Sequence, residues 1–218
     1  WETTTQNNFG VDASLMDNRF SVTFDTYQKL TTGLLLDSSV PGYSGFTTVT
    51  RNIGEVKNSG TEFSLRSFNM DTGDFTWTTT FNISTIHNKI NKLEQNDQIM
   101  NTLTHVLKEG YPLGAFYLIH WEGVDPQTGN SIYTDINGDG VINSGDKQAI
   151  KNKTPWPDYF GGIGNSFSWK GFDLNIFFQF SKGNYIFNHS RYAQEQVGWS
   201  YYYPDPDGTG PYTDLIIP

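Results

Sequence analysis

The sequence predicts an all-β protein, and it favours a segment of a large antiparallel transmembrane β-barrel with about six or seven strands. Aromatic residues make up 16% of the chain and charged residues only 17%, while Thr, Ser and Asn are frequent, which favours strands over helices. Apolar and polar residues alternate with period two, as in a strand with two different faces. Tight turns alternate with long connections, which is typical of outer-membrane barrels.

Three hairpins account for the alternation. The first spans about residues 7–28, where the apolar residues of each strand share one face and a tight turn, "MDNR", joins the strands. The second, near 61–88, turns at "DTGD", and the third, near 161–182, turns at "KGFD". Their apolar faces include Phe9, Val11, Phe20, Val22, Phe24, Phe63, Leu65, Phe75, Trp77, Phe81, Ile83, Ile163, Phe167, Trp169, Phe172, Leu174, Ile176, Phe178 and Phe180.

Long connections are predicted near residues 29–53, 90–160 and 183–218. A soluble extracellular β-sandwich, serving as a binding or adhesion module, is the alternative, because sandwich strands also alternate. The Thr, Ser and Asn rows argue for the barrel, since the exposed face of a sandwich usually carries more Lys and Glu. The two folds differ in whether Trp77 and Phe178 meet lipid or a second sheet.

Composition excludes several functions. The formal net charge is −9 and the chain has no run of Lys or Arg, so nucleic acid is not an expected partner. The chain contains no cysteine, and its four histidines, at positions 87, 105, 120 and 189, lack metal-ligand spacing and are interpreted as structural. No catalytic motif occurs, so an enzyme is not expected. The chain starts "WETTTQNNFG", without a signal-peptide pattern, which suggests a fragment.

Residues 135–146, "DINGDGVINSGD", match a twelve-residue calcium loop. Gly140 stands at position 6, where the backbone turns sharply, and short strands and prolines flank the loop in place of the EF-hand helices. The alternative is an Asp/Asn/Gly turn that binds no metal. The predicted ligands of a structural Ca²⁺ are Asp135, Asn137, Asp139, Val141 through its carbonyl, Asn143 and Asp146.

Aromatic residues in the last predicted loop form a candidate surface for a ligand or partner, because exposed rings stack on sugars and receive proteins. They could equally pack the loop against itself. This surface comprises Trp199, Tyr201, Tyr202 and Tyr203. Trp121 and Glu122 lie near the calcium-type loop and are interpreted as packing residues.

Five blocks of the sequence resemble, in order, the barrel of the SusC/RagA-like TonB-dependent outer-membrane transporters of Bacteroidetes. They are "WETTTQNNFGVDASLMDNRFSVTFDTYQKLTTGLLL", "RNIGEVKNSGTEFSL", "FTWTTTFNISTIHNKINKL", "EGYPLGAFYLIHWEGVDPQTGNSIYTDINGDGVINSGDK" and "PDYFGGIGNSFSWKGFDLNIFFQFSKGNYIFN". The resemblance covers nearly the whole chain.

The resemblance implies a C-terminal portion, residues 1–218, of a barrel of roughly 22 strands in the outer membrane. It implies import of oligosaccharides or peptides, energised by TonB, with a SusD-like surface lipoprotein as partner. The plug domain and the TonB box are not recognisable in these residues. The calcium-type loop would then lie in a long extracellular connection, with a structural role.

Overall fold

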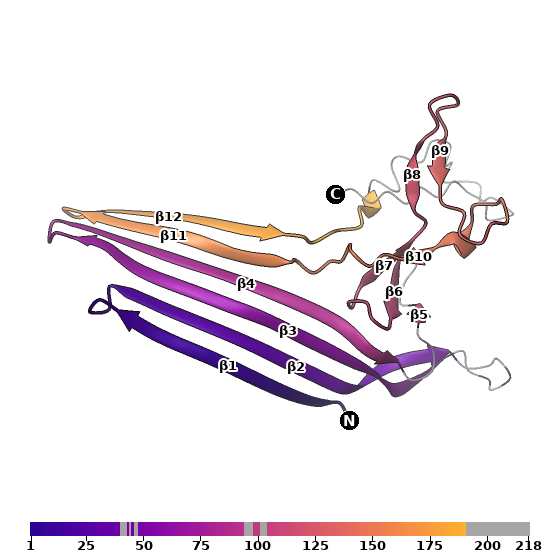
Figure 1. Ribbon diagram of the computed structural model, residues 1–218, viewed down its shortest axis with the longest axis horizontal. Coiled ribbons are helices and arrows are strands. Elements are labelled where there is room, and N and C mark those ends of the chain that lie inside the picture. Colours follow the sequence, from indigo (N-terminus) through magenta and orange to yellow (C-terminus); the bar gives the residue numbers. More distant parts are fainter. Residues whose placement is uncertain (40–42, 44, 46–47, 94–97, 101–103, 191–218) are drawn as a thin grey trace.

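The computed structural model describes residues 1–39, 43, 45, 48–93, 98–100 and 104–190. In this part of the chain, six strands form one antiparallel sheet in the order β1-β2-β3-β4-β11-β12 (Figure 1). The strands are β1 (Thr3–Leu15), β2 (Phe20–Ser39), β3 (Thr48–Asp71), β4 (Phe75–Leu93), β11 (Tyr159–Trp169) and β12 (Phe172–Lys182). The described residues contain no helix that is long and apolar enough to span a membrane.

Three tight turns lie together at one end of this sheet, on the left in Figure 1. The turn between β11 and β12 has only two residues, Lys170 and Gly171, with φ angles of 46° and 87°. Two positive φ angles give the twist that a two-residue hairpin needs. The connections β2–β3 and β4–β11 leave from the opposite end, as the sequence predicts (Figure 1).

The cross-strand register confirms the predicted division into two faces, because residues directly opposite each other in an antiparallel sheet point to the same side. One row across the sheet is Val11, Phe24, Phe63, Ile83, Gly161 and Phe180. The row one residue further on, with the opposite orientation, is Asp12, Thr23, Ser64, Asn82, Gly162 and Gln179. We call these sides the apolar face and the polar face.

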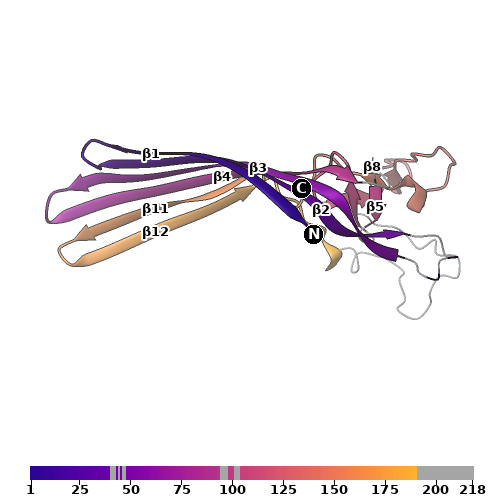
Figure 2. The same ribbon diagram turned by 90° about the horizontal axis from the view of Figure 1, so that it is seen from below.

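Among the described residues no second sheet covers the apolar face, because the main sheet is a single curved layer (Figure 2). Phe172, Leu174 and Phe178 are 75%, 56% and 63% exposed. On β4 the apolar residues run from Phe75 to Ile83, about nine residues, which is the length of a strand that crosses a bilayer at a tilt. We call this band the apolar belt. A sandwich would bury these side chains, so the structure favours the barrel.

Two of the predicted boundaries differ from the structure. The region 29–53, expected as a loop, is mostly strand, because β2 continues to Ser39 and β3 begins at Thr48. The alternation fades there because Leu34, Leu35 and Leu36 follow one another directly and a bulge at Gly33, with φ 69°, interrupts the register. The region 90–160 also contains short strands.

These short strands form a loop module beside the far end of β3 and β4 (Figure 1). Its strands are β5 (Gln98–Met100), β6 (His105–Lys108), β7 (Ala115–Leu118), β8 (Trp121–Val124), β9 (Ser131–Tyr133) and β10 (Gln148–Ala149). Leu107 of the module packs with Val56, Ile90 and Leu93 of the main sheet in a small hydrophobic core. Backbone hydrogen bonds also join Ile90 to Gly110 and Tyr111. The module is therefore attached to the sheet through both apolar packing and backbone pairing.

Candidate functional site

The polar face is a continuous surface of hydroxyl and amide groups between the tight turns and the loop module. Each of its rows crosses several strands, so the surface depends on the register of the whole sheet. Its members include Ser14, Ser21, Thr23, Ser64, Thr78, Thr80, Asn82, Ser84, Ser166, Asn175 and Gln179. Such a face can hold water and offers both donors and acceptors to a polar solute.

Two carboxylates meet on this face. Asp25 of β2 lies directly opposite Glu62 of β3, so that two like charges face each other across the strands. Asp25 has room because its other neighbour in the row is Gly10, where a side chain would collide with the Asp25 carboxylate. Asp25 and Glu62 help to line a hollow of about 280 Å³ with Thr23, Ser64, Asn82 and Ser84. The hollow is suited to hydrogen-bond donors and cationic groups.

An exposed aromatic ring also belongs to the polar face. Phe177 is 66% exposed and lies over the glycines of β11. A Cβ atom built on Gly162 would lie 2.6 Å from the Phe177 ring, and one on Gly164 would lie 3.6 Å from it. The glycines therefore let the ring lie flat against the sheet, where its other side is open to a solute.

The predicted calcium loop, residues 135–146, connects β9 to β10 within the loop module. The carboxylate of Asp135 accepts hydrogen bonds from the backbone N–H groups of Gly138 (2.7 Å) and Gly140 (2.8 Å). Gly138 and Gly140 have φ angles of 71° and 79°, which side-chain-bearing residues rarely adopt. The first residue of the motif thus closes the loop onto its sixth.

The last residue of the motif is the most buried. Asp146 has no exposed surface, and its carboxylate accepts backbone N–H bonds from Asn143 (2.8 Å) and Ile136 (3.0 Å). The hydrogen bond from Asn143 is the largest cause that lowers the pKa of Asp146 below its usual value, although desolvation opposes it. Asp146 is therefore held ionised, and it ties the two ends of the loop together.

The predicted metal ligands of this loop are all oxygen atoms, which suits a hard cation such as Ca²⁺. Asp139 and Asn137 are already bonded to each other and to the backbone, with Asn137 Nδ2 donating to Asp139 Oδ2 at 2.9 Å. The Val141 carbonyl accepts from Asn143 Nδ2 at 3.2 Å. Among the described residues, no three Asp, Glu or His side chains gather closely enough to hold a metal by themselves. A metal shell here would need the Asn and carbonyl oxygens as well.

Other predicted residues have structural contacts in the loop module. Glu122 accepts a hydrogen bond from Thr134 (2.9 Å), and Trp121 pairs with Tyr133 across β8 and β9. The His105 ring lies 5.0 Å from that of Phe116, and burial lowers the pKa of His105. The candidate aromatic surface at Trp199, Tyr201, Tyr202 and Tyr203 lies outside the described residues.

The paired carboxylates and Phe177 were not found by sequence reasoning. Alternation assigns each of them to a face, but the opposition of Asp25 and Glu62 depends on the register between β2 and β3. The sequence feature that could have indicated Phe177 is the pair of adjacent phenylalanines at positions 177 and 178. Neighbouring residues of a strand point to opposite faces, so one of the two rings must lie on the polar face.

No protein-family model matches the chain. TonB-dependent receptor P3 of Formosa agariphila is 36% identical over 214 residues, which cover 87% of this chain and 21% of that protein. TonB-dependent receptor SusC of Bacteroides thetaiotaomicron is 33% identical over 204 residues, covering 86% of this chain and 20% of SusC. The chain thus spans about a fifth of the length of these relatives.

Solved structures show the same likeness in three dimensions. The RagAB peptide transporter matches with a TM-score of 0.78 and 29% identity, over 88% of this chain and 22% of that one. The RagAB peptide importer in the open-open state matches with a TM-score of 0.81 and 29% identity, over 91% of this chain and 22% of that one.

These relatives are named receptors, transporters and importers. An exposed apolar belt and a register that separates apolar from polar residues are the features expected of such a barrel wall. The predicted outer-membrane location and the expectation that the chain is not an enzyme are confirmed by the same relatives. The chain therefore belongs to the SusC/RagA-like TonB-dependent receptors, as a segment of their outer-membrane β-barrel.

Proposed function

We propose that these strands form part of the wall of a TonB-dependent importer of oligosaccharides or peptides. The observation that carries the proposal is the register, which places an apolar row and a polar row on opposite faces of the same six strands. In a barrel, the apolar face meets lipid and the polar face lines the passage. Oligosaccharides and peptides both need the hydroxyl and amide partners that the polar face offers.

Phe177 and the Asp25–Glu62 pair are the proposed contacts for a solute in the passage. An exposed ring stacks against a sugar or an apolar peptide side chain, and carboxylates accept hydrogen bonds from sugar hydroxyls and peptide N–H groups. The carboxylates also repel polyanions, so the proposed substrates are neutral or cationic.

The proposed partners lie at the two ends of the passage. A SusD-like lipoprotein would meet the long connections, a position supported by the loop module that is attached to β3 and β4 at the end opposite to the tight turns (Figure 1). TonB would act from the other side, through parts of the transporter other than these strands.

The import proposal is tested by uptake into cells that carry the full-length transporter, with a labelled oligosaccharide and a labelled peptide supplied separately. We expect Phe177→Ala to reduce uptake of the transported probe by between about twofold and tenfold, the worth of one aromatic contact. Phe178→Ala, the matched change on the apolar face, should leave uptake close to wild type at equal amounts of protein in the membrane. Unchanged uptake by Phe177→Ala would remove this residue from the passage, and failure of both probes would reject the substrate classes.

We also propose that the loop at residues 135–146 binds Ca²⁺ as a structural ion. Two observations support this: the predicted ligands are all oxygen atoms, and the Gly140 N–H group donates to the Asp135 carboxylate, which closes the loop. The ion would offset the repulsion between Asp135, Asp139 and Asp146. Ca²⁺ should protect residues 120–160 of the transporter from protease. Asp139→Ala should abolish that protection, whereas Asp125→Ala, outside the loop, should keep it. Identical digestion of the wild-type protein with Ca²⁺ and with chelator would discard the site.

A further inference from the structure

Charged side chains are divided unevenly between the two faces of the main sheet. Within the apolar belt, the carboxylates Asp12, Asp25, Glu62 and Asp173 point to the polar face. The apolar face carries lysines instead, beyond the belt on the side of the long loops. Two of them, Lys57 of β3 and Lys89 of β4, lie directly opposite each other.

This lysine pair is unusual because like charges directly opposite each other in a sheet destabilise it. Neither lysine makes an ion pair with any residue that the structure describes. The nearest carboxylate on the same face, Glu55, lies one row further from the belt, opposite Lys92, and accepts a hydrogen bond from Asn91 (2.9 Å). The pair therefore lacks compensation from within the described chain, in a protein whose formal net charge is −9.

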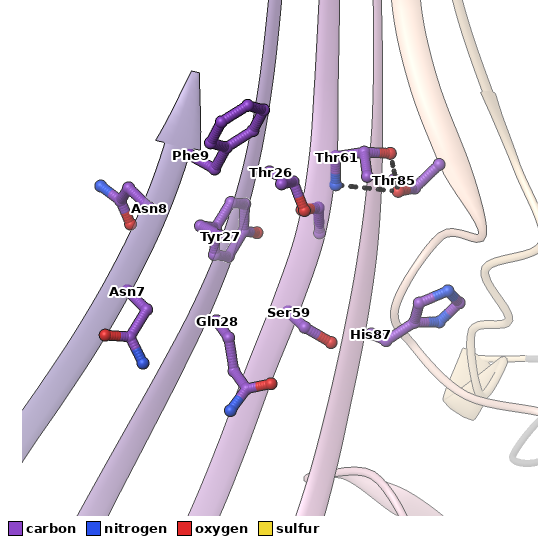
Figure 3. A pocket seen from close by; sticks show the side chains of 11 residues that line it. Asn7, Asn8, Phe9, Thr26, Tyr27, Gln28, Ser59, Thr61, Thr85 and His87 are labelled. Atoms are coloured by element: carbon purple, nitrogen blue, oxygen red, sulfur yellow. Dashed lines mark hydrogen bonds between the residues drawn. The ribbon is translucent and has the colours of Figure 1, made fainter.

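A hollow of about 590 Å³ lies on β1 to β4 next to the apolar belt (Figure 3). Its floor is formed by β1 to β4, and most of its side chains are amides and hydroxyls, with one exposed ring at the belt. The apolar-face residues that line it are Asn7, Phe9, Thr26, Gln28, Ser59, Thr61, Thr85 and His87. Ser59 and His87 form the row next to Lys57 and Lys89.

The height of these groups corresponds to the lipid headgroups. Lys89 lies four residues beyond Thr85, or roughly 10 Å above it along the membrane normal for strands tilted by about 40°. The ammonium of a lysine reaches back towards the membrane on its long stem. The belt, the hollow and the lysine pair therefore present apolar, hydrogen-bonding and cationic surfaces in that order, moving away from the membrane centre.

We propose that this face binds a phosphorylated glycolipid of the surrounding membrane leaflet. The acyl chains lie along the apolar belt at Phe24, Phe63 and Ile83, the sugar occupies the hollow, and a phosphate bridges Lys57 and Lys89. The negative charge of the phosphate removes the repulsion between the two lysines, so binding also stabilises the pairing of β3 with β4.

The test measures binding of diphosphoryl lipid A to the full-length transporter in detergent, by native mass spectrometry. The double variant Lys57→Gln/Lys89→Gln should bind at least about tenfold more weakly, since each lysine near an anionic lipid contributes about fivefold. The matched control Lys29→Gln/Arg66→Gln removes the same charge from the polar face and should stay within about twofold of wild type. Melting in lipid-free detergent confirms that both variants are folded.

Two further binding measurements test which parts of the lipid are recognised. Dephosphorylated lipid A should bind the wild-type protein as weakly as diphosphoryl lipid A binds the double variant. Inorganic phosphate should not displace the lipid, because it lacks the acyl and sugar contacts. Equal binding of both lipids, equal losses in the two double variants, or displacement by phosphate alone would each overturn the proposal.

Discussion

The rings of Phe81 and Phe180 stack 6.4 Å apart although a third strand runs between their own strands. Phe81 belongs to β4 and Phe180 to β12, and Gly161 of β11 lies beneath the Phe180 ring. A Cβ atom on Gly161 would lie 2.9 Å from that ring. Because Gly161 has no side chain, side chains of the two neighbouring strands can make contact across β11.

Gly161→Ala should destabilise the barrel by about 1–3 kcal/mol, because the added methyl group overlaps the Phe180 ring and the Asn82 carbonyl oxygen. Gly164→Ala is the control, since its new Cβ would meet mainly the hydroxyl of Thr80, which can rotate away. Urea unfolding of the full-length transporter in micelles measures both. Equal stabilities of the two variants would contradict the contact.

Phe178→Arg should cost about 2–4 kcal/mol if its side chain points into the bilayer, as the position in the apolar belt indicates. Gln179→Arg, one residue further on, places the same charge on the polar face and should cost far less. Unfolding of each variant in lipid bilayers gives the comparison. The reverse order of stabilities would mean that the two faces have been assigned wrongly.

The loop at residues 135–146 should open as the pH falls. The pKa of Asp146 is lower in the folded loop than in the unfolded chain, so its stabilising contribution is complete above the unfolded value, near 4, and is lost as the pH falls through the folded value. Amide hydrogen exchange at Ile136 and Asn143, which donate to this carboxylate, reports the opening.

Asp146→Asn should remove this pH dependence and raise exchange at every pH, since an amide offers one acceptor oxygen in place of two. Asp125→Asn is the control: hydrogen bonds from Thr128 and Gln127 lower the pKa of Asp125, but it stabilises a different turn. A pH dependence at residues 135–146 that survives Asp146→Asn would assign it to another group.

Glu62→Gln should raise stability by about 0.2–1 kcal/mol at low salt, because it removes the repulsion from Asp25 across the strands. The gain should shrink as salt screens the exposed pair in the wild-type protein. Glu122→Gln, in the loop module, changes the net charge equally without touching this pair. A gain of the same size in both variants would indicate a general effect of net charge.

Much of the main sheet could be predicted, because a strand with one apolar and one polar face leaves a period-two pattern in the sequence. The hairpin that contains Trp77 and the one that contains Phe180 are both seen in the structure. The outer part of β2 could not be predicted, since Leu34, Leu35 and Leu36 follow one another without alternation and the bulge at Gly33 breaks the pattern. The loop closed by Asp135 follows from local turn chemistry, so its conformation could be anticipated.

By itself, the sequence determined which face of each strand is apolar, where the tight turns lie and which family the chain resembles, because all three depend on residues close together in the chain. Only the tertiary structure decided which residues of different strands oppose each other. Lys57 and Lys89, like Asp25 and Glu62, meet through a register set by pairing over the whole length of the strands. Local pattern cannot fix that register, because a strand shifted by two residues keeps the same alternation.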